Sequence, residues 1–289
     1  MGFAIISLAI RLSAWRGDRV VCWEMTQRCL IIADDLTGGA DTGAQFVKCG
    51  IKTFLTSFEE DAPIDFSKFS LQDALVINTD SRGLSPEKAS CLISSLLKNY
   101  DPAVFPVIYK KIDSTLRGNI GYEIDALLQE TKVPLCFMTP AYPEQGRTVV
   151  NGVLMIHGKP LASTEISRDA SYPVREYHVC KVLEFQSRHP VGWVSLKEVA
   201  SGQEVLQKQI EENGKGGSPI LVFDAAERND LTNIADVAFG MARMPLFVGS
   251  AGLAQEVARR LSPSAPRFYQ PNRKRIKPAK RIFIISGSA

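Results

Sequence analysis

A short apolar run followed at once by two acids constrains the fold of this chain more than any other stretch. It opens the segment LIIADDLTGGADTG, residues 30–43. Leu30 to Ile32 is typical of a strand buried on both faces, as in a parallel sheet. Asp34 and Asp35 follow at the carboxyl end of that strand, the edge where open α/β sheets bind their ligands. The competing interpretation is a capped turn between strand and helix, with Asp35 or Thr37 as the helix N-cap.

The residues after the two acids predict a tight turn and then a helix. Thr37 to Gly39 favour the turn, because glycine adopts turn conformations at no steric cost. Ala40 to Cys49 favour the helix, which Gly50 would close.

Apolar strands that end in polar clusters recur along the chain, with predicted helices between them. Ser85 is a good N-cap and Pro86 a good first helical residue, which supports one of those helices. The alternation predicts an α/β fold with a doubly wound, Rossmann-like parallel sheet. In this half of the chain, strands are expected at 53–56, 74–78, 104–109 and 135–138, and helices at 86–100 and 122–130.

The pattern changes after residue 147. Residues 148–160 alternate around Asn151-Gly152, which predicts a β-hairpin. Residues 163–190 are polar and irregular, and the three histidines of the chain lie in this middle part without metal-ligand spacing. We therefore expect a hairpin and an irregular insertion. The α/β pattern then resumes, with strands expected at 192–196, 219–223 and 245–248, and helices at 196–213, 231–241 and from about 250 to 261.

Composition excludes several classes of protein. The 289 residues are 45% hydrophobic and carry a net charge of +3, of which +2 lies in residues 1–28, where four arginines oppose two acids. The remainder is near neutral, which argues against general nucleic-acid binding. No stretch approaches the roughly 18 apolar residues of a spanning helix. Six cysteines without a CxxC pair are typical of free thiols in a reducing cytoplasm, so we expect a cytoplasmic protein without a zinc site.

The two ends of the chain differ from its centre. We expect residues 1–27 to lie outside the fold and translation to begin at Met25, just before the first strand. Residues 262–281 are basic and Pro-rich, which is typical of a solvated linker, although a nuclear-localisation or nucleic-acid patch is the alternative. Residues 282–289 resemble the first strand and the phosphate-holding turn of a further, truncated domain.

The segment KKIDSTLRGNIG, residues 110–121, carries the densest set of candidate binding groups. Its cations suit a carboxylate or a phosphate, and Arg117 can bind either with two hydrogen bonds. Asp113 and Ser114 can bind hydroxyl groups. A surface loop with a salt bridge is the competing interpretation. The candidates here are Lys110, Lys111, Asp113, Ser114, Thr115 and Arg117.

Other strand ends add to the same predicted crevice. Arg82 follows the strand at 74–78, and Tyr142, Glu144 and Arg147 follow the strand at 135–138. Ser250 opens a helix, either as an anion seat or as a plain cap.

Several common motifs are absent from the sequence. It has no GxxxxGK[ST] loop, no GxGxxG after a strand and no GxSxG elbow. Asp34 and Asp35 could act as a general base or as magnesium ligands. Haloacid-dehalogenase-type phosphatases need Asp-x-Asp-x-Thr, whereas these acids are adjacent.

Four segments in this order resemble the four-carbon acid sugar kinase family: IADDLTGGADTG, KKIDSTLRGNIG, AYPEQGRTVVNGVL with PLASTEISRDASYPVRE, and VGSAGLA. The resemblance covers about residues 28–289. It implies phosphorylation of threonate, erythronate or 3-oxo-tetronate at the terminal hydroxyl, with ATP as co-substrate and Mg²⁺ as cofactor. It also implies an acid-sugar-binding domain at 28–261, whose site maps onto Asp35, Arg82, Lys111, Asp113, Ser114 and Arg117, before a nucleotide-binding domain that Ser250 also serves.

The expected roles follow from these residues and from the resemblance together. We expect Asp35 or Asp113 to accept the proton of the attacking hydroxyl, and Ser250 to contact ATP, with no metal site built from protein ligands alone. The expected partners are a small acid sugar and ATP, with a homodimer as one alternative, and neither nucleic acid nor membrane. Substrate-binding candidates are Asp34, Arg82, Lys110, Lys111, Ser114, Thr115, Arg117 and Arg147.

Two departures from the family bear on activity. Most of the nucleotide-binding domain is missing after Ala289, and the first 24 residues do not resemble the family. We therefore expect this chain to bind a tetronate but to turn over ATP poorly or not at all. A non-catalytic acid-sugar-binding module, or an inactive truncated remnant, is the alternative function.

Overall fold

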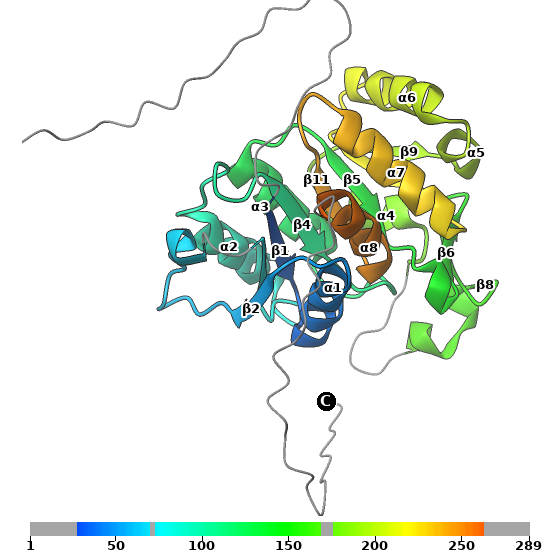
Figure 1. Ribbon diagram of the computed structural model, residues 1–289. Helices are drawn as coiled ribbons and strands as arrows, with labels where there is room; N and C mark the ends of the chain where they lie inside the picture. The colour runs from blue at the N-terminus through cyan, green and yellow to red at the C-terminus, as the bar shows by residue number, and fades with distance from the viewer. Residues whose placement is uncertain (1–27, 70–72, 169–175, 263–289) are drawn as a thin grey trace, which may run out of the picture.

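A computed structural model describes residues 28–69, 73–168 and 176–262 of the chain (Figure 1). The segment predicted outside the fold, nearly all of the predicted linker and the strand predicted at 282–285 lie outside these described residues.

Eight strands form one sheet in the order β2-β3-β1-β4-β11-β5-β10-β9, and every pair of neighbours is parallel. The predicted parallel α/β fold is therefore confirmed. The strands contain few polar residues because both faces of the sheet are covered. Their bounds are β1 (Cys29–Ala33), β2 (Thr53–Ser57), β3 (Ala74–Asn78), β4 (Val107–Lys111), β5 (Cys136–Thr139), β9 (Val191–Val194), β10 (Ile220–Phe223) and β11 (Leu246–Gly249).

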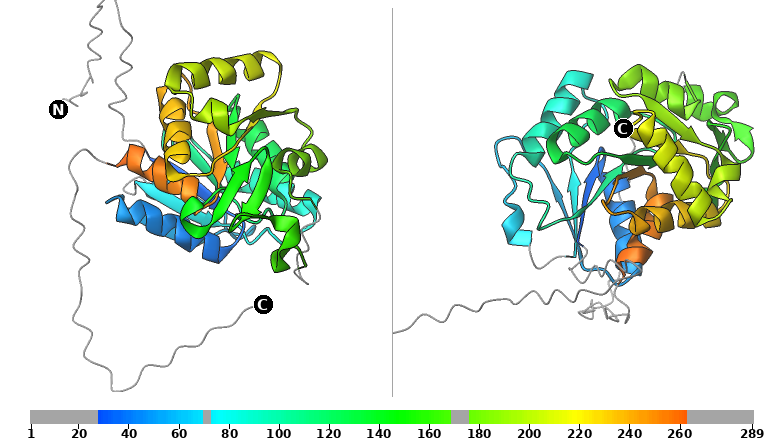
Figure 2. Two further views of the ribbon diagram at one scale, coloured as in Figure 1. Left: turned by 90° about the vertical axis from the view of Figure 1, so that its right-hand side faces the viewer. Right: turned by 90° about the horizontal axis from the view of Figure 1, so that it is seen from above.

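Helices cover both faces of the sheet, as Figure 2 shows from two further directions. On one face α1 packs against α8 and α8 against α7, and on the other α2 packs against α3 and α3 against α4. α5 and α6 pack against α7. The bounds are α1 (Leu36–Lys48), α2 (Pro86–Leu97), α3 (Ile120–Thr131), α4 (Val179–Gln186), α5 (Leu196–Val199), α6 (Gln203–Lys215), α7 (Arg228–Gly240) and α8 (Ala251–Leu261).

The central strand β1 marks the point where the strand order reverses. The chain runs from β1 to β2 at one edge of the sheet, returns to β3 between them, and then crosses to β4 on the other side of β1. Ala33, the last residue of β1, is in register with Asn78 of β3 and Lys111 of β4. The polar residues that follow these three strands therefore lie side by side, at the place where doubly wound sheets bind ligands.

The start of α1 differs from the prediction of a turn. The helix begins at Leu36, so Thr37 to Gly39 form its first turn instead of preceding it. A Cβ atom on Gly39 would lie 3.2 Å from Ala33 Cβ and 3.3 Å from Val76 Cγ1. The glycine therefore lets the helix approach the sheet closely, and it does not mark a turn.

The hairpin was predicted correctly. β6 (Arg147–Val150) and β7 (Val153–Ile156) are antiparallel and are joined by Asn151 and Gly152, which have φ of +53° and +71°. Two positive φ values are the mark of a type I′ turn. A short third strand, β8 (Lys159–Pro160), pairs with β7.

Two other segments differ from the sequence-based expectation. The helix predicted at 196–213 is two helices, α5 and α6, because Gly202 has φ of +95° and interrupts the helical backbone. The region expected to be irregular contains α4, whose buried Val179, Val182 and Leu183 follow helical spacing.

Single 3₁₀ turns are η1 (Phe66–Phe69), η2 (Pro143–Gln145), η3 (Leu161–Ser163) and η4 (Glu165–Arg168).

Two further expectations concern the cysteines and the membrane. Cys29, Cys136 and Cys180 are free and buried, whereas Cys91 is free and exposed. Within the described ranges, none of the helices has the length and apolarity needed to cross a bilayer.

Candidate functional site

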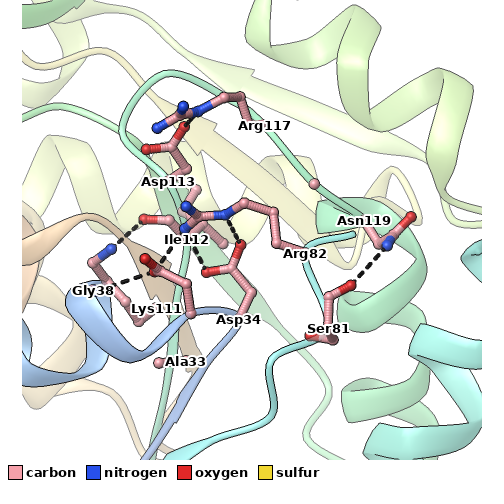
Figure 3. Close-up of polar contacts among 12 residues, drawn as sticks. Ala33, Asp34, Gly38, Ser81, Arg82, Lys111, Ile112, Asp113, Arg117 and Asn119 are labelled. Atoms are coloured by element: carbon pink, nitrogen blue, oxygen red, sulfur yellow. Dashed lines mark hydrogen bonds and ion pairs between the residues drawn. The ribbon is translucent and has the colours of Figure 1, made fainter. Parts of the chain in front are cut away.

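A cavity of about 220 Å³ opens at the carboxyl edge of the sheet, beside the ends of β1 and β4. Residues from α1, from the loops after β3, β4 and β5, from β6 and from the start of α8 contribute to its wall. Figure 3 shows part of this polar cluster. The lining residues are Asp35, Thr37, Gly38, Asp41, Arg82, Lys111, Asp113, Ser114, Arg117, Tyr142, Arg147, Ser250 and Ala251.

Arg82 joins the loop after β3 to the end of β1. Its Nε lies 2.8 Å from Asp34 Oδ2, and its Nη2 lies 3.0 Å from Asp34 Oδ1 and 2.7 Å from Asp35 Oδ1. Burial disfavours the charge of Arg82, but the hydrogen bond to Asp34 and the charges of three aspartates outweigh burial and raise its pKa. Arg82 thus holds both acids of the opening motif in fixed positions.

Asp35 is both a helix cap and a wall of the cavity. Its Oδ1 accepts a hydrogen bond of 3.1 Å from the backbone N–H of Gly38, which caps α1. Within the described residues, the hydrogen bonds that the Asp35 carboxylate accepts all reach Oδ1. Its other carboxylate oxygen, Oδ2, remains able to meet a ligand hydroxyl, so the capping and the functional interpretations are compatible.

Lys111 lies beside Gly38 at one side of the cluster (Figure 3). Its residue is only 6% exposed, and Nζ donates to the carbonyl oxygen of Ile112 at 2.8 Å. Burial lowers the pKa of Lys111, and the nearby charges of Asp34, Asp35 and Asp113 only partly oppose that effect. An anion that entered the cavity would stabilise the charged ammonium of this lysine.

Asp113 is the most strongly held acid of the cavity. Arg117 Nε donates to Asp113 Oδ2 at 2.5 Å, and the hydroxyl of Thr115 donates to the same oxygen. Burial tends to raise the pKa of Asp113, but these hydrogen bonds and the charges of Arg117 and Arg82 lower it to about 2. Asp113 is therefore an anion near neutral pH, and its clearest role is to orient Arg117.

The hairpin carries Arg147 to the opposite wall. Its Nη1 donates to Ser114 Oγ at 2.6 Å and to Gln145 Oε1 at 3.1 Å, and both of these oxygens are neutral. Ser250 lines the cavity at the start of α8, where its hydroxyl donates to the Ala141 carbonyl at 2.7 Å and accepts from the Gly252 N–H at 3.1 Å.

Comparison with known proteins places this chain in one family. Residues 29–257 match the family model described as "Sugar-binding N-terminal domain". The chain belongs to the four-carbon acid sugar kinase family.

Three relatives illustrate the match. A D-threonate kinase of Salmonella typhimurium is 34% identical over 262 residues, which cover 90% of this chain and 58% of that protein. A D-erythronate kinase of Heliobacterium modesticaldum is 37% identical over 217 residues, covering 73% of this chain and 48% of that protein. A solved structure from Bordetella bronchiseptica, described as a domain of unknown function with bound citrate in a domain-swapped dimer, superposes with a TM-score of 0.68 at 31% identity, covering 80% of this chain and 55% of that one. This chain therefore spans about half the length of these family members.

Most of the site residues predicted from the motifs of the family lie around the one cavity. Three predicted substrate-binding residues, Asp34, Lys110 and Thr115, do not line it. Asp34 lies behind Arg82, and Thr115 reaches the cavity only through Asp113. Those that line the cavity are Asp35, Arg82, Lys111, Asp113, Ser114, Arg117, Arg147 and Ser250.

Lys110 is the clearest correction. It is fully buried on the opposite face of the sheet, where Nζ lies 2.9 Å from Glu123 Oε2 of α3. Lys110 and Lys111 both belong to β4, and successive side chains of a strand point to opposite faces. Glu144, which we expected in the crevice, instead lies 3.9 Å from Arg228, with its side chain about half exposed.

Sequence reasoning missed Thr37 and Asp41 of α1. They are four positions apart, so they lie on one face of the helix. That spacing carries the signal only if the helix begins before Thr37, whereas our prediction began it at Ala40. Asp41 is held by Gln45, whose Nε2 donates to Asp41 Oδ1 at 3.1 Å.

Proposed function

We propose that this chain supplies the acid-sugar-binding part of a kinase that transfers phosphate from ATP to the terminal hydroxyl of a four-carbon acid sugar. The single observation that carries this proposal is the small cavity at the strand-order reversal, where four cationic side chains meet aspartates. The names of the relatives, D-threonate kinase and D-erythronate kinase, support the same substrate class.

The cavity has separate groups for the two ends of such a substrate. Lys111 and Arg117 would bind the carboxylate, because an ammonium and a guanidinium form charge-assisted hydrogen bonds with it. Ser114 and Asp35 would bind the sugar hydroxyls. Much of the binding energy would come from groups already held in place by neighbouring side chains, since preorganisation lowers the entropic cost of binding.

Asp35 is the better of the two candidates for the catalytic base. In phosphoryl transfer an aspartate can accept the proton of the attacking hydroxyl. Asp113 already accepts hydrogen bonds from Arg117 and Thr115, and its low pKa of about 2 makes it a weak base. Asp35 has one carboxylate oxygen outside its hydrogen bonds to Gly38 and Arg82, so it would orient the hydroxyl and take its proton.

ATP would act as co-substrate, and Ser250 is the described residue that we assign to its side of the cavity. Within the described ranges, no three His, Cys, Asp or Glu side chains form a group that could hold a metal ion. Mg²⁺ is usually held by one or two carboxylates together with the phosphates of the nucleotide, so we assign no step to the metal.

Location and assembly remain proposals of the same kind. The free cysteines and the use of ATP support a cytoplasmic protein. A homodimer is the assembly that we propose, and light scattering of the purified chain would measure it.

Calorimetric titration tests the proposed substrate class. We expect D-threonate or D-erythronate to bind the chain, and threitol and erythritol, which lack the carboxylate, to bind at least about 30-fold more weakly. Equal affinity for acid and polyol, or binding of neither by the folded chain, would contradict the proposal.

Phosphate transfer tests the kinase half separately. Phosphorus NMR of the protein with ATP and the bound acid measures formation of a phosphate ester at the terminal carbon, which we expect to be slow or absent for this 289-residue chain. Asp35→Asn should slow that transfer by about 100-fold or more, as expected for loss of a general base, while acid binding persists. Transfer by this chain at a rate typical of kinases, about 1–100 s⁻¹, would contradict the expectation of poor turnover.

A further inference from the structure

The loop that carries Arg82 is held from behind by the first turn of α3. Asn119 Nδ2 donates to the backbone carbonyls of Ser81, at 3.1 Å, and Leu84, at 2.9 Å. Figure 3 shows Asn119 beside Ser81, on the far side of Arg82 from the cavity cluster. Arg82 lies between the two carbonyls that Asn119 holds.

Asn119 is the N-cap residue of α3, yet its side chain makes no capping hydrogen bond to the helix. An asparagine at this position ordinarily accepts a hydrogen bond from a backbone N–H of the first turn. Here the amide instead donates across to the loop. The Asn119 side chain therefore bonds to the loop and does not cap the helix, which indicates that its role is to hold this loop.

Glu123, one turn further along α3, holds the same loop through a second contact. The hydroxyl of Ser81 donates to Glu123 Oε1, and the other carboxylate oxygen forms the ion pair with Lys110. Glu123 and Lys110 are almost completely buried. Burial raises the pKa of Glu123, and the positive charge of Lys110 opposes that rise, as expected for a buried acid with a buried partner.

The loop before Arg82 is also tied to the end of β1, because the backbone N–H and the hydroxyl of Thr79 both donate to the Ala33 carbonyl at 2.9 Å. Asp80 has φ of +49°, a conformation that non-glycine residues adopt at some cost. The backbone N–H of Arg82 donates to the Asp34 carbonyl at the long distance of 3.3 Å. Asp34 and Asp35 orient the guanidinium itself, whereas the contacts that Ser81 makes with α3 hold the backbone next to Arg82.

We propose that Asn119 and Glu123 are positioning residues that fix Arg82, and through it Asp34 and Asp35, for acid binding. This inference rests on the proposed function of the cavity. Neither residue lines the cavity, so both would act only through the loop.

A double-mutant cycle tests this proposal. Asn119→Ala and Ser81→Ala each remove contacts between α3 and the loop, and Arg82→Lys keeps the charge but loses the two-pronged pairing. Ser90→Ala is the matched control, because the Ser90 hydroxyl also bonds to α3, at the Tyr122 carbonyl, 3.2 Å away, but away from the loop. Affinity for D-threonate or D-erythronate, whichever binds the unmodified chain, would be measured calorimetrically after far-UV circular dichroism has established folding.

We expect Asn119→Ala and Ser81→Ala to weaken acid binding by about tenfold and Ser90→Ala to leave it unchanged. In the Arg82→Lys background the loss should shrink to less than about twofold, because the residues act through Arg82. An equal loss in both backgrounds, or unchanged affinity in folded Asn119→Ala and Ser81→Ala, would overturn the proposal. If Asn119→Ala does not fold, the acid affinity of Ser81→Ala in the two backgrounds tests the proposal alone.

A second readout needs no ligand. The Nε–H of Arg82 gives its own nitrogen–proton NMR signal, and its exchange with solvent should be faster in Ser81→Ala than in the unmodified chain. Unchanged exchange would contradict positioning. If the unmodified chain binds no acid, the proposed function fails, whereas the exchange of this proton still decides whether α3 fixes Arg82.

Discussion

Arg82 donates from Nε and Nη2 to both carboxylate oxygens of Asp34, at 2.8 and 3.0 Å. This pair ties the loop after β3 to the end of β1. The Asp34 side chain is only 3% exposed and that of Arg82 only 15%. Removal of one member of such a pair leaves the other charge buried and without its partner.

Asp34→Asn should therefore lower the free energy of unfolding by about 3–5 kcal/mol. Asp35→Asn should lower it by less than about 1 kcal/mol, because asparagine is also a good N-cap and the Asp35 side chain is 25% exposed. Urea denaturation of the two variants, compared with the unmodified chain, measures both values. A larger effect for Asp35→Asn than for Asp34→Asn would contradict the assignment of Asp34 as the structural acid.

Arg117→Ala should abolish acid binding without unfolding the chain. The variant removes a guanidinium from the cavity wall, which should weaken binding of the carboxylate by at least about 2 kcal/mol, or about 30-fold. Calorimetry with the acid and a thermal melt together give both results. Arg188→Ala is the control, because Arg188 is also paired with an aspartate, Asp125, at 3.2 Å, but lies outside the cavity. Equal affinities in the two variants would count against Arg117 as a ligand of the carboxylate.

The sheet and its functional edge could be predicted because their signals are local. Apolar runs such as Leu30 to Ile32 are long enough to identify buried strands, and the polar residues after them mark the strand ends. The reversal of strand order at β1 follows once successive strands pack on both sides of it. Residues from distant motifs, such as Asp35 and Arg117, thus come together as the pattern predicted.

Single side chains at element boundaries could not be placed in this way. The strand predicted to end at Tyr109 continues to Lys111, and within a strand adjacent lysines must point to opposite faces. One of the two lysines pairs with Glu123 on the other face of the sheet, and the other enters the cavity. The sequence does not show which is which, because Glu123 is distant from both in the chain. The start of α1 was misplaced for a similar reason, because the close approach of Gly39 to β3 is a tertiary effect.

Stability should depend on the ionisation of Asp113 at low pH. Its pKa in the folded chain is lowered from 3.8 to about 2. A lowered folded-state pKa stabilises the protein above the unfolded pKa, and this contribution of about 2 kcal/mol is lost as the pH falls from about 4 to 2. Between pH 5 and pH 2, the free energy of unfolding of Asp113→Asn should therefore fall by about 2 kcal/mol less than that of the unmodified chain. Urea denaturation across this range measures the difference, and equal pH slopes would mean that Asp113 titrates as an ordinary carboxylate.

Gly38→Ala should weaken acid binding although alanine favours helices more than glycine does. A Cβ atom at this position would lie 2.6 Å from Lys111 Nζ and would also clash with Asp35 Oδ1. The lysine end is flexible, so the chain should fold, with Lys111 displaced from its place in the cavity wall. We expect an affinity loss of about tenfold or more, which is about 1.4 kcal/mol.

Gly43→Ala provides the matched control for that substitution within the same helix. A Cβ atom there would meet only apolar side-chain atoms, at 3.3 Å from Val76 Cγ2 and 3.5 Å from Thr53 Cγ2. Any effect of Gly43→Ala should therefore appear in the melting temperature and not in the affinity of the folded protein for the acid. Calorimetric titration of both variants separates the two effects. If Gly38→Ala bound the acid as well as Gly43→Ala does, the position of Lys111 would not govern binding, and the carboxylate would have to be held by the arginines alone.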